Sequence, residues 1–165
     1  MAASPKKQLA LDVNVLLDLA EGWDFAQDFR EEFLRRGYGL FVTPTAAGEL
    51  NILSLYAAKP TRSFALQALQ ELRRWEIQPC PLSDLNLAIA ERFSRRLVER
   101  RLIPEEEWND GRILGETSVS GVPLLVTSDK HLLDIDDDAL LLVFNEADLP
   151  PVRPAHPKRL LRAVR

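Results

Sequence analysis

Two aspartates follow apolar runs at places where side chains that bind a divalent cation are commonly found. Asp12 directly follows the run LAL, and Asp129 lies two residues beyond VPLLVT (residues 122–127). Both runs are short and continuously apolar, which is typical of buried parallel strands. Ligands of open α/β sheets bind beyond the carboxyl ends of the strands. We therefore expect both carboxylates to line one crevice.

Two further acids stand in apolar helical surroundings. Glu49 lies in TAAGELNILSLY, and the nine positions on either side of it contain no other charged residue. A buried carboxylate without a partner is costly, and a bound cation removes that cost. Asp110 shares a helix face with the apolar residues three and four positions later, so it is expected to point inward. Glu116 lies about 240° around that helix and is not expected to join Asp110.

Four carboxylates in one crevice repel each other and stay ionised together only if cations neutralise them. Oxygen ligands suit Mg²⁺ or Mn²⁺. Such ions generate hydroxide from bound water, orient a phosphate and stabilise a leaving oxygen. The chemistry indicated is metal-assisted hydrolysis of a phosphodiester. Taken singly, each acid also has a structural interpretation: Asp12 as a turn residue, Glu49 as the partner of an arginine, and Asp110 and Asp129 as helix caps.

The elements that must position these acids alternate along the chain. Helices are predicted at residues 14–20, 23–36, 44–58, 61–75, 83–101 and 104–121, and buried strands at 8–13, 39–43, 76–80, 122–127 and 140–144. This alternation predicts an α/β fold with a mainly parallel sheet. We expect one domain over residues 1–148. Residues 149–165, which are rich in proline and then basic, are expected to form an extension outside that core.

Charge and cysteine content narrow the class of protein. The net charge is -4, and residues 153–165 carry five basic residues and no acid, which leaves -9 on residues 1–152. A simple electrostatic nucleic-acid binder is therefore disfavoured, and a cation site is consistent with the acidic body. A single cysteine excludes an internal disulfide and favours a cytoplasmic protein. No apolar run has the length of about 18–20 residues that a transmembrane helix needs.

A basic stripe is a possible contact for a nucleic-acid backbone. Arg92, Arg96 and Arg100 are spaced four residues apart on one predicted helix. They are our candidates for contacts with the phosphates of a nucleic acid. The neighbouring Glu91 and Glu99 favour the alternative of a solvated face whose charges pair with each other.

The order of the four acids resembles that of the PIN-domain nucleases. In this family an aspartate ends the first strand, a glutamate lies in the helix after the second strand, an aspartate opens a later helix, and a last aspartate follows the next strand. The matching segments cover about residues 8–144: Asp12 in LDVNVLLDL, Glu49 in VTPTAAGEL, Asp110 in WNDGRILGE and Asp129 in LLVTSDKHLL. The resemblance implies that these four residues are the catalytic metal ligands.

The same resemblance implies an α/β/α sandwich, Mg²⁺ or Mn²⁺ as cofactor, single-stranded RNA as substrate and a homodimer. It implies that Asn14 and Thr127 or Ser128 orient the metal-bound carboxylates through hydrogen bonds, as such ligands require. Within the family the chain looks most like VapC-like toxins of type II toxin–antitoxin pairs, which implies an antitoxin partner. Two features depart from such toxins: the surplus basic tail, and Gly111, which is expected to loosen the helix that carries Asp110.

Other interpretations remain open at the level of sequence. The same fold could act as a binding or regulatory module without activity, although four retained acids argue against this. A housekeeping RNA-processing nuclease without an antitoxin is equally consistent with the acids. A haloacid-type phosphatase would want an acid at position 14, where this chain has Asn14. A phosphoacceptor receiver domain would want paired acids after the first strand, and neither of these two classes explains Glu49 and Asp110.

Overall fold

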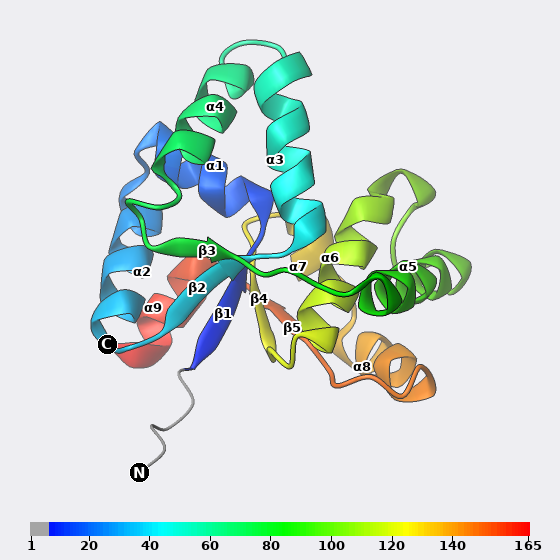
Figure 1. Ribbon diagram of the computed structural model, residues 1–165. Coiled ribbons are helices and arrows are strands. Elements are labelled where there is room, and N and C mark those ends of the chain that lie inside the picture. The colour runs from blue at the N-terminus through cyan, green and yellow to red at the C-terminus, as the bar shows by residue number, and fades with distance from the viewer. Residues whose placement is uncertain (1–6) are drawn as a thin grey trace.

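The structure, a computed structural model that describes residues 7–165, is built around one parallel sheet (Figure 1). Its five strands are β1 (Gln8–Leu11), β2 (Gly39–Val42), β3 (Ile77–Pro79), β4 (Leu124–Val126) and β5 (Arg153–Ala155). They are ordered β3-β2-β1-β4-β5, and every neighbouring pair is parallel. The predicted α/β class with a parallel sheet is confirmed.

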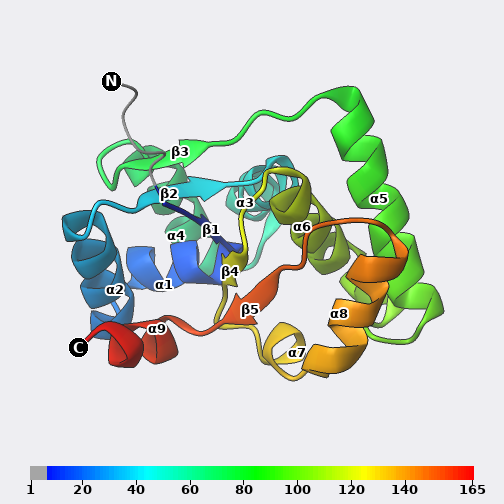
Figure 2. The ribbon, with the colours of Figure 1, turned by 90° about the horizontal axis from the view of Figure 1, so that it is seen from below.

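Helices cover both faces of this sheet. They are α1 (Val13–Glu21), α2 (Asp24–Arg35), α3 (Pro44–Tyr56), α4 (Thr61–Glu71), α5 (Asp84–Glu99), α6 (Trp108–Val119), α7 (Lys130–Leu133), α8 (Asp137–Glu146) and α9 (Pro157–Val164), with a short 3-10 turn at Glu105–Glu107. Figure 2 shows α1, α2 and α9 on one side of the sheet and α5, α6 and α8 on the other. Helices α3 and α4 form a hairpin that rises away from the sheet (Figure 1). The α/β/α sandwich is therefore confirmed.

The helix that carries Glu49 begins where its sequence predicts. Thr43 is extended, its side chain accepts a hydrogen bond from the Ala46 N–H, and Pro44 is the first helical residue. Proline is favoured at this position because the first amide of a helix has no partner and the proline ring sets φ correctly. Since Thr43 directly follows β2, the cap fixes where α3 leaves the sheet, and with it the course of Glu49.

The predicted strand at residues 140–144 is wrong, because this segment belongs to α8. The helix is capped by Asp136, whose side chain accepts from the Ala139 N–H. One face of the helix is buried, at Leu140, Val143 and Phe144. Leu141 and Leu142, between them, are exposed. A short apolar run does not distinguish a strand from a helix, and here the acid-rich start of the segment favours the helix.

Residues 149–165 are not an extension outside the core, so that prediction is also wrong. They form the fifth strand and the last helix, with β5 paired to β4. Pro154 lacks an N–H, which is tolerated because β5 lies at the edge of the sheet. Leu161 of α9 is buried in the core. The C-terminal strand therefore completes the sheet beside the strand that leads to Asp129.

Gly111 lets α6 approach α5, and α6 is continuous through this position. A Cβ atom at Gly111 would clash with the Ser94 Oγ atom, and one at Gly115 would lie 2.8 Å from the Ala90 Cα atom. The Ser94 hydroxyl donates to the Trp108 carbonyl at the start of α6. These two glycines therefore set the distance between α5 and α6, and with it the position of Asp110.

Candidate metal centre

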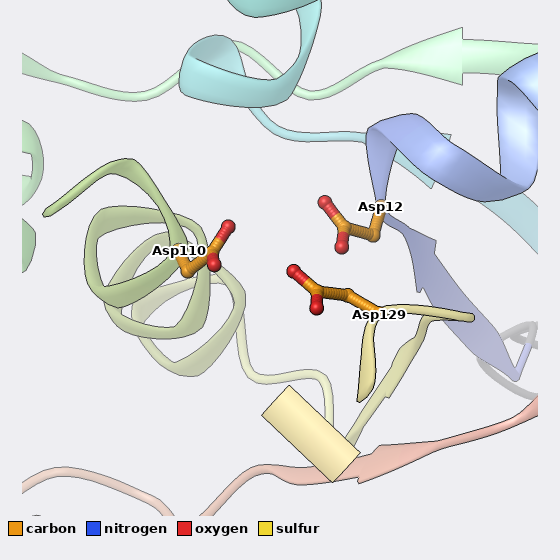
Figure 3. A group of neighbouring side chains, drawn as sticks. All are labelled: Asp12, Asp110 and Asp129. Atoms are coloured by element: carbon orange, nitrogen blue, oxygen red, sulfur yellow. The ribbon is translucent and has the colours of Figure 1, made fainter. Parts of the chain in front are cut away.

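Three aspartates from distant parts of the sequence converge on one point. Asp12, Asp110 and Asp129 each offer a carboxylate oxygen, and these oxygens all lie within 4.8 Å of one another. Figure 3 shows the side chains pointing toward one another from the end of β1, from α6 and from the loop after β4. Such a spacing of oxygens allows one small divalent cation to contact all three residues.

The sheet register explains why Asp12 faces the loop that carries Asp129. Strands β1 and β4 are neighbours, and Leu11 pairs with Val126. The Asp12 N–H continues this pairing by donating to the Val126 carbonyl at 2.9 Å. Asp12 and Thr127 are therefore adjacent at the carboxyl edge of the sheet, where the sequence predicted the crevice.

Both oxygens of the buried Asp12 carboxylate are held in place. Oδ1 accepts from the Val13 N–H at 2.8 Å, and Oδ2 accepts from the Thr127 hydroxyl at 2.8 Å. The Asn14 amide, oriented so that both of its ends are satisfied, donates to Oδ2 at 3.0 Å and accepts from the Asp129 N–H at 3.1 Å. Asn14 and Thr127 thus link two of the three aspartates. That these hydrogen bonds of Asn14 and Thr127 orient metal-bound carboxylates stays a prediction.

Asp110 has a polar atom that fits a cation. Its side chain is 8% exposed, and its Oδ2 atom is buried without a hydrogen-bond partner among residues 7–165. A buried carboxylate oxygen left unpaired is costly. Asp110 belongs to the three-aspartate group, where an ion held by oxygen ligands would satisfy such an atom. The residues present therefore fit Mg²⁺ or Mn²⁺.

Glu49 lies beside this group, although it is not one of its three members. Its side chain is half-buried, and burial is the main cause that raises its pKa to about 7. The negative charges of Asp12, Glu107 and Asp129 raise that pKa further. Glu49 thus feels the charges of the three-aspartate group, but whether it ligates a cation stays a prediction.

Glu107 is an acid of this site that the sequence interpretation missed. Its charge contributes to raising the pKa of Asp12, Glu49 and Asp110. The residue lies three positions before Asp110, at the end of the 3-10 turn that precedes α6. The three-residue spacing between Glu107 and Asp110 places both acids on one helix face, which was the available signal. However, Glu107 is the last of three successive glutamates, and such a run is also typical of an ordinary helix start.

The protonation of the aspartates reflects their burial and mutual repulsion. Burial raises the pKa of Asp12 to about 6, opposed by the hydrogen bonds from Thr127 and Val13 and assisted by the charges of Asp129 and Glu107. Burial is also the main cause that raises the pKa of Asp110, followed by its contact with the Glu107 side chain and by the charges of Asp12 and Asp129. Burial and mutual repulsion thus oppose full ionisation of these acids, and a bound cation would favour it.

These shifts predict how the stability of the metal-free protein depends on pH. An acid whose pKa is higher in the folded state binds more protons there, so its contribution to stability is complete below the unfolded pKa and is lost as the pH rises through the folded value. For Asp12 the loss falls between about pH 4 and 6, and the shift corresponds to about 3 kcal/mol. In EDTA, the Asp12 titration should lower the melting temperature of the wild type as the pH rises from about 4 to about 6. This contribution should be missing in Asp12→Asn. Identical pH dependences would contradict this.

Ser128 and Arg100, two other predicted residues, contact residues outside the three-aspartate group. The Ser128 hydroxyl donates to the Asp18 carboxylate at 2.8 Å, so Ser128 orients Asp18 and not one of the three aspartates. Arg100 is paired with Glu146 on α8. Arg92 and Arg96 form no ion pair within residues 7–165. A role of these arginines with RNA stays a prediction.

Comparison with known proteins finds the fold in solved structures. No protein-family model and no curated protein sequence matches the chain. Among solved structures, a chain of VapBC2 from Rickettsia felis, bound to a DNA fragment from its promoter, has a TM-score of 0.62 at 13% identity and covers 90% of this chain and 98% of its own. VapBC-1 from nontypeable Haemophilus influenzae gives 0.59 at 9% identity, covering 92% and 98%. FitAcB from Neisseria gonorrhoeae gives 0.54 at 15% identity, covering 90% and 97%.

These similarities extend over nearly the whole of both chains in each pair. At such low sequence identity they describe the fold, and the fold agrees with the order of acids found in the sequence. The five parallel strands and the helices on both faces of this chain lie within the aligned fold, which covers 90% of the chain in the first comparison. The chain therefore has a PIN-like fold.

Proposed function

We propose that this protein is a metal-dependent ribonuclease that hydrolyses phosphodiester bonds of single-stranded RNA. The observation that carries the proposal is the convergence of Asp12, Asp110 and Asp129, with one buried carboxylate oxygen left unpaired. The fold shared with the VapBC and FitAB chains supports it. Sequence resemblance to PIN-domain nucleases supplies the reaction and the substrate class.

Each residue of the site has a defined part in this proposal. Asp12, Asp110 and Asp129 would hold Mg²⁺ or Mn²⁺, and Glu49 would complete the negative wall of the crevice. A bound cation would supply charge for the phosphate and lower the pKa of a water molecule. The hydrogen bonds from Thr127 and Asn14 would keep the Asp12 carboxylate from rotating when RNA binds.

Cleavage assays with purified protein test the proposal. A labelled single-stranded RNA, the matching duplex RNA and a single-stranded DNA are incubated with Mg²⁺, with Mn²⁺ and with EDTA. We expect cleavage of the single-stranded RNA with either metal and none in EDTA. Cleavage that persists in EDTA would contradict the metal mechanism. An intact, folded protein that cuts none of several RNAs would favour a binding module without activity.

A partner protein forms part of the proposal. The similar chains come from VapBC and FitAB structures. The resemblance to VapC-like toxins implies that this protein has an antitoxin partner and acts in the cytoplasm. Copurification with a small protein encoded beside the gene would support the toxin assignment. A nuclease active in the cell without such a neighbour would indicate a housekeeping role.

Along residues 7–165, no helix combines the length and apolar character needed to cross a bilayer.

We further propose that the chain forms a homodimer through the outer face of α3. Ile52, Leu55 and Tyr56 share that face and are 56%, 57% and 80% exposed. Exposed apolar clusters of this kind mark protein contacts. Leu55→Glu is expected to shift the protein from dimer to monomer in light-scattering chromatography. Leu85→Glu, at an exposed leucine of α5, is the control and should leave the mass unchanged. A wild type that is already monomeric would contradict the dimer.

A further inference from the structure

Glu116 is a charged residue of α6 that is fully buried, with 0% of its surface exposed. It lies six residues beyond Asp110, around the helix from it, as the sequence indicated, and it has no part in the three-aspartate group. Within residues 7–165 no cationic side chain pairs with it. A buried carboxylate without a cation is costly unless hydrogen bonds satisfy it, so its partners explain its presence.

Both oxygens of Glu116 accept hydrogen bonds from one residue of another helix. Oε1 accepts from the Thr45 N–H at 2.8 Å, and Oε2 accepts from the Thr45 hydroxyl at 2.5 Å. Thr45 is the second residue of α3, where the amides lack partners within the helix and the helix dipole favours a negative charge. The contact satisfies a buried anion and an unpaired amide together.

This contact joins the two helices that carry the acids of the site. Thr45 and Glu49 are four residues apart and therefore share a face of α3. Glu116 and Asp110 lie on α6, about 9 Å apart along the helix axis. Glu49 on α3 and Asp110 on α6 are both affected by the same charges, those of Asp12, Asp129 and Glu107. Those carboxylates repel each other, which would tend to separate the helices when no cation is bound.

We propose that Glu116 is a positioning residue that holds Glu49 in register with the three aspartates, so that the divalent cation is bound by a preformed set of acids. The proposal rests on the function proposed above. A carboxylate suits this role because it accepts from the amide and the hydroxyl of Thr45 at once. Glutamine retains both contacts in weaker form, since its carbonyl accepts from the amide and its NH₂ group donates to the hydroxyl.

Mn²⁺ binding, measured by calorimetry without RNA, tests this role. In Glu116→Ala we expect the Mn²⁺ affinity to fall roughly tenfold, the scale found when a residue that orients a metal ligand is removed. Glu116→Gln should recover most of the affinity. The same change at an exposed position of α5, Glu99→Gln, is the control and should leave binding unchanged. If Glu116→Ala does not fold, Thr45→Val, which removes only the hydroxyl, replaces it and should weaken binding in the same direction.

A double-mutant cycle separates positioning from general loss of structure. If Glu116 acts through Glu49, then Glu116→Ala should cause no further loss of Mn²⁺ affinity in a Glu49→Gln protein. An equal loss in both backgrounds, or wild-type affinity in folded Glu116→Ala, would overturn the proposal. Mn²⁺ binding that follows the predicted pattern without RNA cleavage would refute the ribonuclease and leave the positioning role standing. RNA cleavage by the wild type together with unchanged Mn²⁺ binding in Glu116→Ala would refute the positioning role and leave the ribonuclease standing.

Discussion

Replacing Asp12 by asparagine is expected to lower the rate of RNA cleavage by on the order of 10³-fold, because several kcal/mol of metal-derived stabilisation is lost. Asp12 is 3% exposed and lies at the centre of the hydrogen bonds from Val13 and Thr127. Asparagine keeps the shape and one acceptor but removes the charge that draws the cation. Calorimetry should show the loss of Mn²⁺ affinity that underlies the loss of rate.

The same substitution at Asp18 is the matched control. Asp18 lies on α1, the helix that Asp12 caps at its N-terminus. Its carboxylate accepts a hydrogen bond from the Ser128 hydroxyl. Asparagine can still accept that bond. We expect Asp18→Asn to bind Mn²⁺ with wild-type affinity. If both variants lose Mn²⁺ affinity equally, the site is sensitive to any change in this region and Asp12 is not a specific ligand.

Adding a methyl group to α6 at Gly115 should destabilise the protein by about 1–3 kcal/mol, the usual cost of overpacking. The new Cβ atom would meet the Ala90 Cα atom at 2.8 Å and the Ala90 carbonyl oxygen at 3.0 Å. These are backbone atoms, so α5 and α6 must separate to admit the methyl group. Since α6 also carries Asp110, the Mn²⁺ affinity should fall together with the urea midpoint.

Gly48→Ala makes the identical chemical change where there is room for it. Nothing lies within 4 Å of a Cβ atom at this position in α3. Alanine should stabilise the protein there by about 0.4–1 kcal/mol, because the unfolded chain loses conformational freedom. Urea unfolding followed by circular dichroism measures both variants. A loss of stability in Gly48→Ala as large as in Gly115→Ala would show that the close approach of α5 and α6 is not the cause.

The residues that follow directly from strand ends could be predicted from the sequence. Asp12 and Asp129 come after short apolar runs, and the carboxyl edge of a parallel sheet brings such positions together. The start of α3 at Thr43 and Pro44 was equally visible, since capping preferences are local. Local signals therefore located the sheet edge and two of the three aspartates that converge there.

The C-terminal part of the chain shows where local signals are insufficient. Residues 140–144 are apolar enough for a buried strand, and only their packing shows that one face of a helix is buried. A strand over Arg153–Ala155 includes Pro154, which a central strand would not accept, and its place at an edge depends on how the whole sheet is ordered.

The contacts between α3 and α6 could not be read from the sequence either. Glu116 pairs with Thr45 across 71 residues, and this pairing depends on how the two helices pack. Glu107 contributes charge to the site only because α6 begins close to the three aspartates. In both cases the residue type is common, and its role arises from the tertiary arrangement.

The metal centre can be tested most directly by anomalous diffraction from crystals soaked in Mn²⁺. We predict one strong anomalous peak between Asp12, Asp110 and Asp129, at coordination distances of roughly 2.0–2.2 Å from their oxygens, the range of hard divalent cations of this size. The peak should disappear in Asp12→Asn crystals. A well-ordered, Mn²⁺-saturated crystal with no peak at the three aspartates, or with its peak elsewhere, would contradict the metal centre on which the proposed ribonuclease depends.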